Sequence, residues 1–337
     1  MALQPSISIV MPSYNGSAYI HQAIDSVLAQ SLNDWELIIS DDCSTDDTAS
    51  YLQSINHPRI KIYSQPSNRG IFDNLNFLFS KAIAPITQIL CQDDTFTDSN
   101  SLKTILYMWR ERDSHLAFIR SNHGDDQTKS KLNRFERDVI PMLPRVVRPQ
   151  QSDILFFIFG CIPGNLSNVS MRTSLVAEIG GFNQSLPYAG DFEFWTRLGR
   201  LHPWAISATK VVNVRAHAKQ ASNTLNFKGE LVPQLALIID TLYYNLVSAG
   251  VNKSALRLLA TLTYVSRQRD AAIRRILSGR GSLYLNIVEH AFCNRAFSLR
   301  KDIGWLLYFA SIGGRTLAVE ASKILINTKA VRRILSE

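Results

Sequence analysis

Cysteine is scarce in this sequence of 337 residues, and its four cysteines form no CxxC pair and no regular spacing. The sequence therefore predicts neither a disulfide framework nor a zinc site, and a reducing cytoplasm is the expected compartment. Long apolar runs are missing as well. No segment reaches about 18 apolar residues, so none is predicted to span a bilayer. The first residues lack a basic stretch, so no signal peptide is predicted.

The sequence also lacks the glycine motifs that bind phosphates. The turn after the first apolar run is "MPSYNGSAY", which has one glycine, whereas a dinucleotide site needs G-x-G-x-x-G. No GK[ST] occurs, which excludes a P-loop. A bound diphosphate would need its charge neutralised in another way, and the paired aspartates of this sequence favour a divalent metal ion.

Apolar runs of strand length alternate with segments of helical periodicity in the first ninety residues. The pattern predicts strands at 7–11, 35–40, 59–64 and 86–91, and helices at 18–30, 46–55 and 72–83. In the first helix we expect Ile20, Ala23, Ile24, Val27 and Leu28 to share one face. Such alternation predicts an α/β fold, a parallel sheet with helices on both faces.

Polar clusters follow three of the predicted strands. They read "MPSYNG" (11–16), "SDDCSTDDT" (40–48) and "QDDTF" (92–96). Ligands of parallel sheets bind at the carboxyl ends of the strands. We therefore expect the three clusters to converge on one crevice.

Charge divides the chain into two parts. Residues 1–227 hold 20 Lys/Arg against 21 Asp/Glu, net −1, whereas residues 228–337 hold 16 against 7, net +9. We predict two domains with these bounds, the second of them helical. Its basic and amphipathic character, with clustered arginines (267, 269, 274, 275 and 280), is typical of docking on an anionic membrane surface. A helical cap or a homo-oligomer interface explains the same pattern.

The stretch "ISIVMPSYNGSAYIHQAIDSVLAQSLNDWELIISDDCSTDDT" resembles the opening of glycosyltransferase family 2. The resemblance continues through "NRG" (68–70), "QDD" (92–94), "IGGF" (179–182), "GDFEFW" (190–195) and "RAHAKQAS" (215–222), about two thirds of the chain. It implies the GT-A fold, a Rossmann-like and mostly parallel sheet, followed in this chain by a C-terminal helical part. It also implies transfer of a sugar from a nucleotide sugar to an acceptor hydroxyl, with inversion.

The resemblance assigns the donor-binding residues. In the family a carboxylate after the second strand accepts the ring N–H of uracil or thymine, and this role falls by position on Asp42 first and Asp41 second. An ionised carboxylate only accepts hydrogen bonds, so it selects a base edge that donates. Cys43 stands where glycine is usual, and glycine permits a positive φ. Further donor contacts fall by position on Pro12, Tyr14, Asn15, Asn68, Arg69 and Asp93.

The resemblance also assigns a metal site and a base. "CQDD" corresponds to the family's DxD-type motif, with Cys91 in place of the leading acid. Asp94 is the implied ligand of Mn²⁺ or Mg²⁺, and His217 lies where relatives carry a group close to the metal. Asp191 is the implied catalytic base at the start of a helix, and Gly190 occupies the position of a usual acidic neighbour.

The sequence thus predicts a glycosyltransferase, hexosyltransferase in type, that uses a UDP- or dTDP-sugar. The expected acceptor is a lipid-linked glycan of a surface polysaccharide such as lipopolysaccharide or capsule. The expected place is the cytoplasm, peripheral on the inner face of the membrane, with no nucleic-acid partner. Two alternatives remain: a catalytically weak or dead nucleotide-sugar-binding protein, and a sugar-phosphate nucleotidyltransferase. The second would need a glycine-rich, basic loop after the first strand, which is absent.

Overall fold

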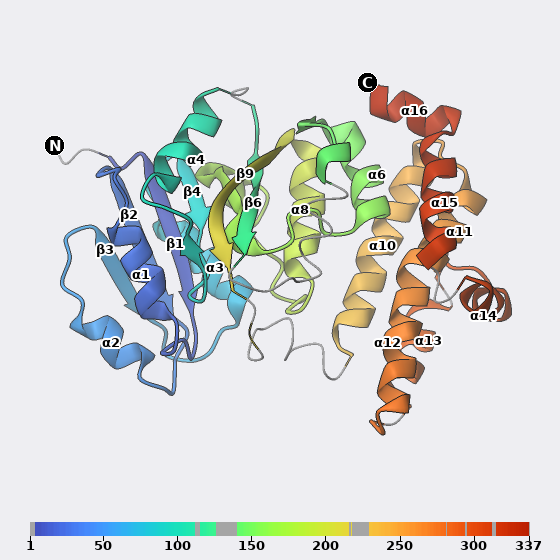
Figure 1. Cartoon of the computed structure of the whole chain (residues 1–337), viewed down its shortest axis with the longest axis horizontal. Helices are drawn as coiled ribbons and strands as arrows, with labels where there is room; N and C mark the ends of the chain where they lie inside the picture. Colours follow the sequence, from blue (N-terminus) through green and yellow to red (C-terminus); the bar gives the residue numbers. More distant parts are fainter. Residues whose placement is uncertain are drawn as a thin grey trace. The chain divides into compact units, whose positions relative to one another are not determined.

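The computed structural model describes residues 4–111, 115–125, 140–215, 217, 229–280, 282–293, 295–311 and 315–336 (Figure 1). The chain divides into two compact units. One comprises Met1–Pro149 with Pro163–His217, and the other Gln150–Ile162 with Ala218–Glu337. The predicted boundary at residue 227 lies outside the described residues, and the assignment of separate roles to the two domains stays a prediction.

The first unit begins with the predicted alternation of strands and helices (Figure 1). Its elements are β1 (Ile7–Ser13), α1 (Ile20–Leu28), β2 (Trp35–Asp41), α2 (Thr48–Ser54), β3 (Ile60–Ser64), α3 (Ile71–Lys81) and β4 (Ile86–Ile89). β1 lies between β2 and β4, β3 pairs with β2, and all three pairings are parallel. The predicted α/β fold with a parallel sheet is confirmed for this part.

Helices cover both faces of these strands. On β1, Ile7, Ile9 and Met11 pack in one cluster with the buried residues of α1, whereas α3 also contacts β1 and β2. Successive side chains of a strand point to opposite faces, so a strand between two helical layers is apolar throughout. The predicted face of α1 holds except for Leu28, which is 42% exposed. At 100° per residue, Leu28 lies at the margin of the stripe that Ile20, Ile24 and Val27 form.

The remainder of the sheet was not predicted. It comprises β5 (Thr95–Phe96), β6 (Phe118–Asp125), β7 (Val146–Val147), β8 (Val169–Arg172) and β9 (Trp204–Val214). The strand order is β3-β2-β1-β4-β8-β6-β9-β5, with β7 on β9. β8 runs antiparallel between β4 and β6, and β9 runs parallel to β6. The helices of this region are α4 (Ser101–Arg110), α7 (Thr173–Glu178) and α8 (Gly190–Leu201).

The second unit is helical in its described residues, as predicted. It contains α6 (Pro149–Phe159), α10 (Leu231–Ser248), α11 (Lys253–Ala260), a π-helical turn (Thr261–Val265), α12 (Ser266–Leu277), α13 (Leu283–Phe292), α14 (Lys301–Ala310), α15 (Arg315–Ile326) and α16 (Lys329–Ser336). The Tyr264 hydroxyl donates to the carbonyl groups of Phe156 and Phe157, which ties α6 to the C-terminal helices. α6 is therefore a helix from the middle of the chain inside the C-terminal unit.

One helix of the described residues, α10, is long and apolar enough to cross a membrane by length and composition. It also carries polar contacts to the loop after α13 and to α6, within its unit. Asp240 forms an ion pair with Arg295 at 2.9 Å, and the Asn245 amide donates to Asp153 at 2.9 Å. These contacts are those of a helix packed in a bundle.

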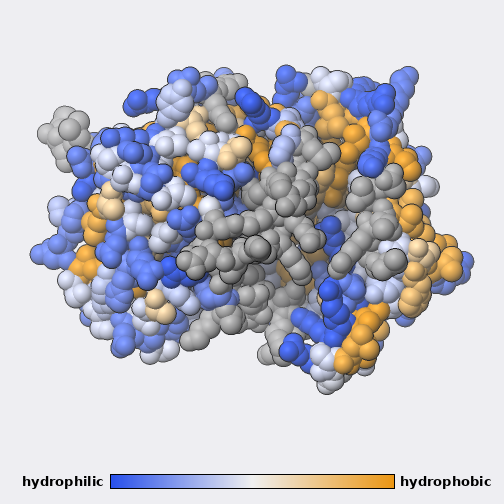
Figure 2. All heavy atoms as spheres, viewed as in Figure 1, coloured by the Kyte–Doolittle hydropathy of each residue, from blue (hydrophilic) through white to orange (hydrophobic). Residues whose placement is uncertain are grey.

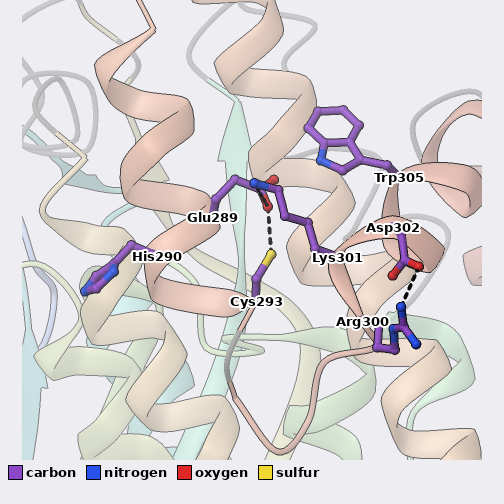
Figure 3. Close-up of a pocket in the computed structure, with 7 residues that line it drawn as sticks. All are labelled: Glu289, His290, Cys293, Arg300, Lys301, Asp302 and Trp305. Atoms are coloured by element: carbon purple, nitrogen blue, oxygen red, sulfur yellow. Dashed lines mark hydrogen bonds and ion pairs between the residues drawn. The ribbon is translucent and has the colours of Figure 1, made fainter.

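The predicted cluster of arginines is not one basic face. Arg269 is only 1% exposed and forms a bidentate pair with Glu289, with an Nε–Oε1 distance of 2.8 Å. It lies three residues from Ser266 and Ala272 on the buried side of α12, so its grouping with the surface arginines was wrong. Glu289 also accepts from the Cys293 thiol, beside an open depression of about 940 Å³ (Figure 3).

Candidate active site

The loop after β4 is joined to the loop after β1 by one side chain, Gln92. Its amide oxygen accepts from the Ser13 hydroxyl at 2.8 Å and from the Tyr14 N–H at 3.0 Å. Its amide nitrogen donates to the Tyr14 carbonyl at 2.9 Å. A Cβ on Gly16 would lie 2.1 Å from the Gln92 oxygen. Any larger residue at position 16 would therefore clash with the Gln92 amide.

The loop after β2 is joined to the loop after β1 through Asn15. The Asn15 N–H donates to the Ser44 hydroxyl, and its side-chain oxygen accepts from the Thr45 N–H, each at 2.8 Å. The Asp46 carboxylate accepts from the N–H groups of Ser17 and Thr48. It thereby supports the start of α2. The three polar clusters therefore converge at one edge of the sheet.

Asp41 and Asp42 end β2 and are almost fully buried, with 2% and 3% exposure. The two oxygens of Asp42 accept from the backbone N–H groups of Arg69 and Gly70, at 2.8 and 2.9 Å. Burial raises the pKa of Asp42 above its usual value. A carboxylate has about four acceptor sites, so these two bonds position the group and leave acceptor capacity.

The "NRG" loop is held at both ends. The Asn68 side chain accepts from the Gly70 N–H at 3.1 Å, and Arg69 forms an ion pair with Asp73 in the first turn of α3. Gly70 has a φ of 79°, which glycine adopts without strain. Arg69 is thus fixed by its own loop and helix, beside Asp42.

Cys43 has a φ of 64°. By the resemblance glycine is usual at this position, and Cys43 adopts the positive φ that glycine permits. An exposed cysteine in the left-handed region carries local strain, directly after the two aspartates that end β2.

Asp94 is the most enclosed acid at this edge, with 1% exposure. One oxygen, Oδ1, accepts from the Arg215 N–H at 3.0 Å, whereas Oδ2 is buried and has no hydrogen-bond partner among the described residues. Burial and the neighbouring charge of Asp93 raise the pKa of Asp94 to about 7. A cation next to Oδ2 would relieve both effects.

The residues of the "CQDD" loop fit a divalent cation. Cys91, Asp93 and Asp94 each place one ligand atom within 4.8 Å of the other two. His217 lies against the same group, with its Nε2 2.9 Å from Asp93 Oδ2. A thiol and two carboxylates, one of which has an unpartnered buried oxygen, are a suitable donor set for a metal ion, and the His217 imidazole adjoins this set through Asp93.

Tyr19, just before α1, completes this cluster. Its ring centre lies 4.5 Å from that of His217, and the Arg215 guanidinium lies 4.9 Å from it. Neither Tyr19 nor Gln92 was singled out from the sequence. An aromatic residue at a helix start is typical of a core position, and an amide between cysteine and aspartate carries no chemistry of its own. The other residues of "RAHAKQAS" lie outside the described residues.

Asp191 lies in the first turn of α8, and its Oδ1 accepts from the Phe192 N–H at 2.7 Å. Burial raises the pKa of Asp191 to about 6. No hydrogen bond between described residues joins it to the metal cluster. A Cβ on Gly190 would lie 2.7 Å from the Phe72 ring. An acidic neighbour would not fit there, which explains the glycine.

α3 links the start of α8 to the donor loops. Phe72 is in its first turn, directly after the Arg69–Gly70 segment that Asp42 holds. Further along α3, the Asn76 amide exchanges two hydrogen bonds with the backbone of Phe182, at 2.9 and 2.7 Å. Gly181 of "IGGF" thus allows close approach to Asn76, since a Cβ on Gly181 would lie 2.6 Å from its oxygen.

Glu193 belongs to a structural brace on α8. Its carboxylate pairs with Arg197 at 2.8 Å, and Arg197 also donates to the carbonyl groups of Ile179 and Gly181. Among the described residues, this leaves Asp191 as the carboxylate of the first turn of α8 that is not in an ion pair.

Comparison with known proteins agrees with the resemblance to glycosyltransferase family 2. Residues 8–168 match the family described as Glycosyl transferase family 2. An uncharacterized glycosyltransferase of Haemophilus influenzae is 27% identical over 66% of this chain and 69% of its own length. The chondroitin synthase of Escherichia coli is 28% identical over 59% of this chain, but the match spans only 27% of that longer protein.

The fold is also found in a solved structure. S. aureus TarS, residues 1–349, in complex with UDP-GlcNAc, superposes with a TM-score of 0.59 over 94% of this chain and 90% of that one. The sequences are 15% identical, so this likeness concerns the fold. It supports the predicted GT-A architecture, including the presence of C-terminal helices.

Proposed function

Because residues 8–168 carry a glycosyl transferase family 2 domain, we propose that the protein is an inverting glycosyltransferase. It moves a hexose-type sugar from a UDP- or dTDP-sugar to an acceptor hydroxyl. The observation that carries the proposal is the buried Asp94 carboxylate, which has one unpartnered oxygen at the edge where the loops after β1, β2 and β4 meet.

The donor nucleotide lies in this proposal against the loops after β1 and β2. Asp42, with Asp41 beside it, accepts the ring N–H of uracil or thymine. The Tyr14 ring, which is 45% exposed, offers a flat face to the base. The proposed contacts to the nucleoside also include Pro12, Asn15, Asn68, Arg69 and, at the ribose, Asp93. Gln92 and Asn15 position this set through the hydrogen bonds described above.

Asp94 and His217 would hold a divalent cation, Mn²⁺ or Mg²⁺. When bound, it supplies positive charge that offsets the charge developing on the leaving nucleoside diphosphate. Asp94 contributes the unpartnered Oδ2. His217 is kept in place by Asp93 and by the Tyr19 ring.

Asp191 acts in this proposal as the general base. Inversion follows from a single displacement at the anomeric carbon, in which the acceptor hydroxyl must lose its proton. A carboxylate whose pKa is raised to about 6 is ionised at neutral pH and is a stronger base than an ordinary aspartate. Through Gly190, Phe72 and Gly70, its helix is tied to the loop that Asp42 holds.

Product analysis separates this function from the two alternatives. Incubation of the protein with a UDP-sugar and Mn²⁺ is expected to release UDP, which chromatography measures. A nucleotidyltransferase working on the same donor and pyrophosphate would give UTP and a sugar phosphate. A dead binding protein would give no product while still retaining the donor. Either of these results would overturn the proposal.

The acceptor we propose is a lipid-linked glycan in the synthesis of a surface polysaccharide, reached at the inner face of the membrane. α14 supports this. Ile303, Leu306 and Phe309, on one side of the helix, are 42%, 72% and 70% exposed. Arg300 and Lys301 at its start have side chains 80% and 63% exposed. Figure 2 shows hydrophobic surface over this helix, at the right-hand edge. An apolar row flanked by cations suits an anionic interface.

Replacing Leu306 and Phe309 together by glutamate is expected to weaken binding to anionic vesicles by at least tenfold. Each large apolar side chain contributes roughly 1.5–3 kcal/mol when it is buried. Sedimentation of the protein with phosphatidylserine vesicles measures the change. The matched control replaces Tyr107 and Leu201, exposed residues of the first unit, and should bind like the wild type. Equal binding by the α14 variant, or no binding by the wild type, would instead indicate an interface between copies, which light scattering detects.

A further inference from the structure

The turn that follows β4 gathers three possible metal ligands and turns the fourth side chain away. The Asp94 N–H donates to the Cys91 carbonyl at 3.0 Å and closes the turn. Gln92 points to Tyr14 and is occupied there. Cys91, Asp93 and Asp94 are left, and their ligand atoms lie within 4.8 Å of one another.

Two hydrogen bonds hold the backbone at Cys91. The Cys91 N–H donates to the Ser167 hydroxyl at 2.9 Å, and the preceding Leu90 N–H donates to the Val10 carbonyl at 3.0 Å. The residue is thus anchored to two elements that flank the loop. Its sulfur faces a cluster in which Asp94 Oδ2 is buried and has no hydrogen-bond partner among the described residues.

Resting on the metal-dependent transfer proposed above, we propose that Cys91 Sγ is itself a ligand of the cation. The site then prefers divalent ions that accept sulfur, such as Zn²⁺ and Co²⁺, to Mg²⁺. Thiolates favour these softer ions, whereas an all-oxygen set favours Mg²⁺. Binding replaces the S–H bond by a metal–sulfur bond, and the thiol proton leaves to water.

The separations suit one ion. A sulfur ligand at about 2.3 Å and an oxygen ligand at about 2.1 Å stand roughly 3.6 Å apart in a tetrahedral site, so the three atoms, which lie within 4.8 Å of one another, would need to close by about 1.2 Å at most.

Titration of the full chain with Co²⁺, with and without UDP, tests the proposal by absorption spectroscopy. The wild type is expected to show a sulfur-to-cobalt charge-transfer band in the near ultraviolet. Cys91→Ser should lose this band while keeping the weaker visible bands of carboxylate-bound cobalt. Cys161→Ser, the matched control, should keep the charge-transfer band. Cys91→Asp should lose it and release Co²⁺ to Mg²⁺ at about tenfold lower concentration than the wild type does.

The proposal is overturned if the wild type binds Co²⁺ without the band, if the band survives in Cys91→Ser, or if Mg²⁺ displaces Co²⁺ equally from wild type and Cys91→Asp. Asp94→Ala distinguishes failure of the sulfur ligand from failure of the metal site in the proposed function. Loss of cobalt binding in this variant, together with no charge-transfer band in the wild type, leaves the metal site standing and removes only the sulfur ligand. Unchanged cobalt binding in Asp94→Ala removes the metal site itself.

Discussion

Replacing Asp191 by asparagine is expected to lower kcat by about 10²–10⁴-fold, the range over which a general base contributes. Asparagine keeps the shape of the side chain and the acceptor for the Phe192 N–H, so the helix start should persist. UDP binding should be unchanged because the nucleotide contacts lie on other loops. Turnover of the donor and calorimetric titration with UDP measure the two effects.

The matched control is Glu193→Gln on the same helix, which should keep kcat within a few-fold, since Glu193 is paired with Arg197. Near-normal turnover in Asp191→Asn, or equal loss in both variants, would show that Asp191 is not the base. The pH profile adds a second check. Because the pKa of Asp191 is raised to about 6, kcat of the wild type should fall as the pH drops below that value.

The same variant should change stability with a definite sign. A folded-state pKa of about 6 lies above the unfolded value of about 3.9. The ionised carboxylate therefore disfavours the folded state fully above pH 6, and the effect vanishes below pH 4. Asp191→Asn is expected to raise the free energy of unfolding by about 1–3 kcal/mol at pH 8. Urea denaturation at pH 8 and at pH 4 measures this difference.

Replacing Asp94 by alanine is expected to abolish the part of UDP binding that depends on the metal, a loss of about 100-fold or more. Removing a charged, buried ligand costs several kcal/mol of interaction. Calorimetric titrations with UDP, with and without Mn²⁺, should give nearly equal affinities for the variant and very different ones for the wild type.

Two comparisons make this result specific. Asp98→Ala, four residues along the chain at an exposed position, should behave as the wild type does. Asp191→Asn should keep the metal dependence. If Asp94→Ala keeps it as well, or if Asp191→Asn loses it, the division of roles between the two carboxylates is wrong.

The first half of the sheet followed from the sequence because its signals are local. β1 and β2 are buried on both faces and are mostly apolar, with a buried hydrogen bond from Ser8 to Glu36, and the helices between the strands keep a 3.6-residue period. The location of the site followed from topology, since parallel strands present their carboxyl ends at one edge. The roles expected of Asp41, Asp42 and Asp94 came from the resemblance to glycosyltransferase family 2.

The second half of the sheet depends on contacts between distant residues. β8 has four residues, and its place is fixed by bonds such as that from the Trp109 indole N–H to the Ser170 hydroxyl. α6 is buried almost all around, so it offers no polar face that shows where it packs. The prediction for Arg269 was wrong for a related reason. An arginine is rarely buried unless it has an ion-pair partner, and the partner here, Glu289, is 20 residues away in the sequence.

Site residues of the same kind escaped the sequence analysis. Gln92 acts through Tyr14, 78 positions earlier in the chain. Phe72 fills the space next to Gly190, and Tyr19 packs against His217. None of these residues belongs to a motif that the sequence alone would mark as functional. Their role depends on contacts between segments that are far apart in the sequence and meet only in the folded chain.

The central claim is that the edge formed by the loops after β1, β2 and β4 binds a uracil or thymine nucleoside diphosphate through Asp42. Calorimetric titration of the wild type with UDP and with CDP, both in Mn²⁺, tests it most directly. Uracil has a ring N–H at N3, whereas N3 of cytosine is only an acceptor, so an acceptor that must pair with a ring N–H separates the two bases by about 1–3 kcal/mol. UDP should therefore bind roughly 10–100 times more tightly than CDP. Equal affinities would contradict the account.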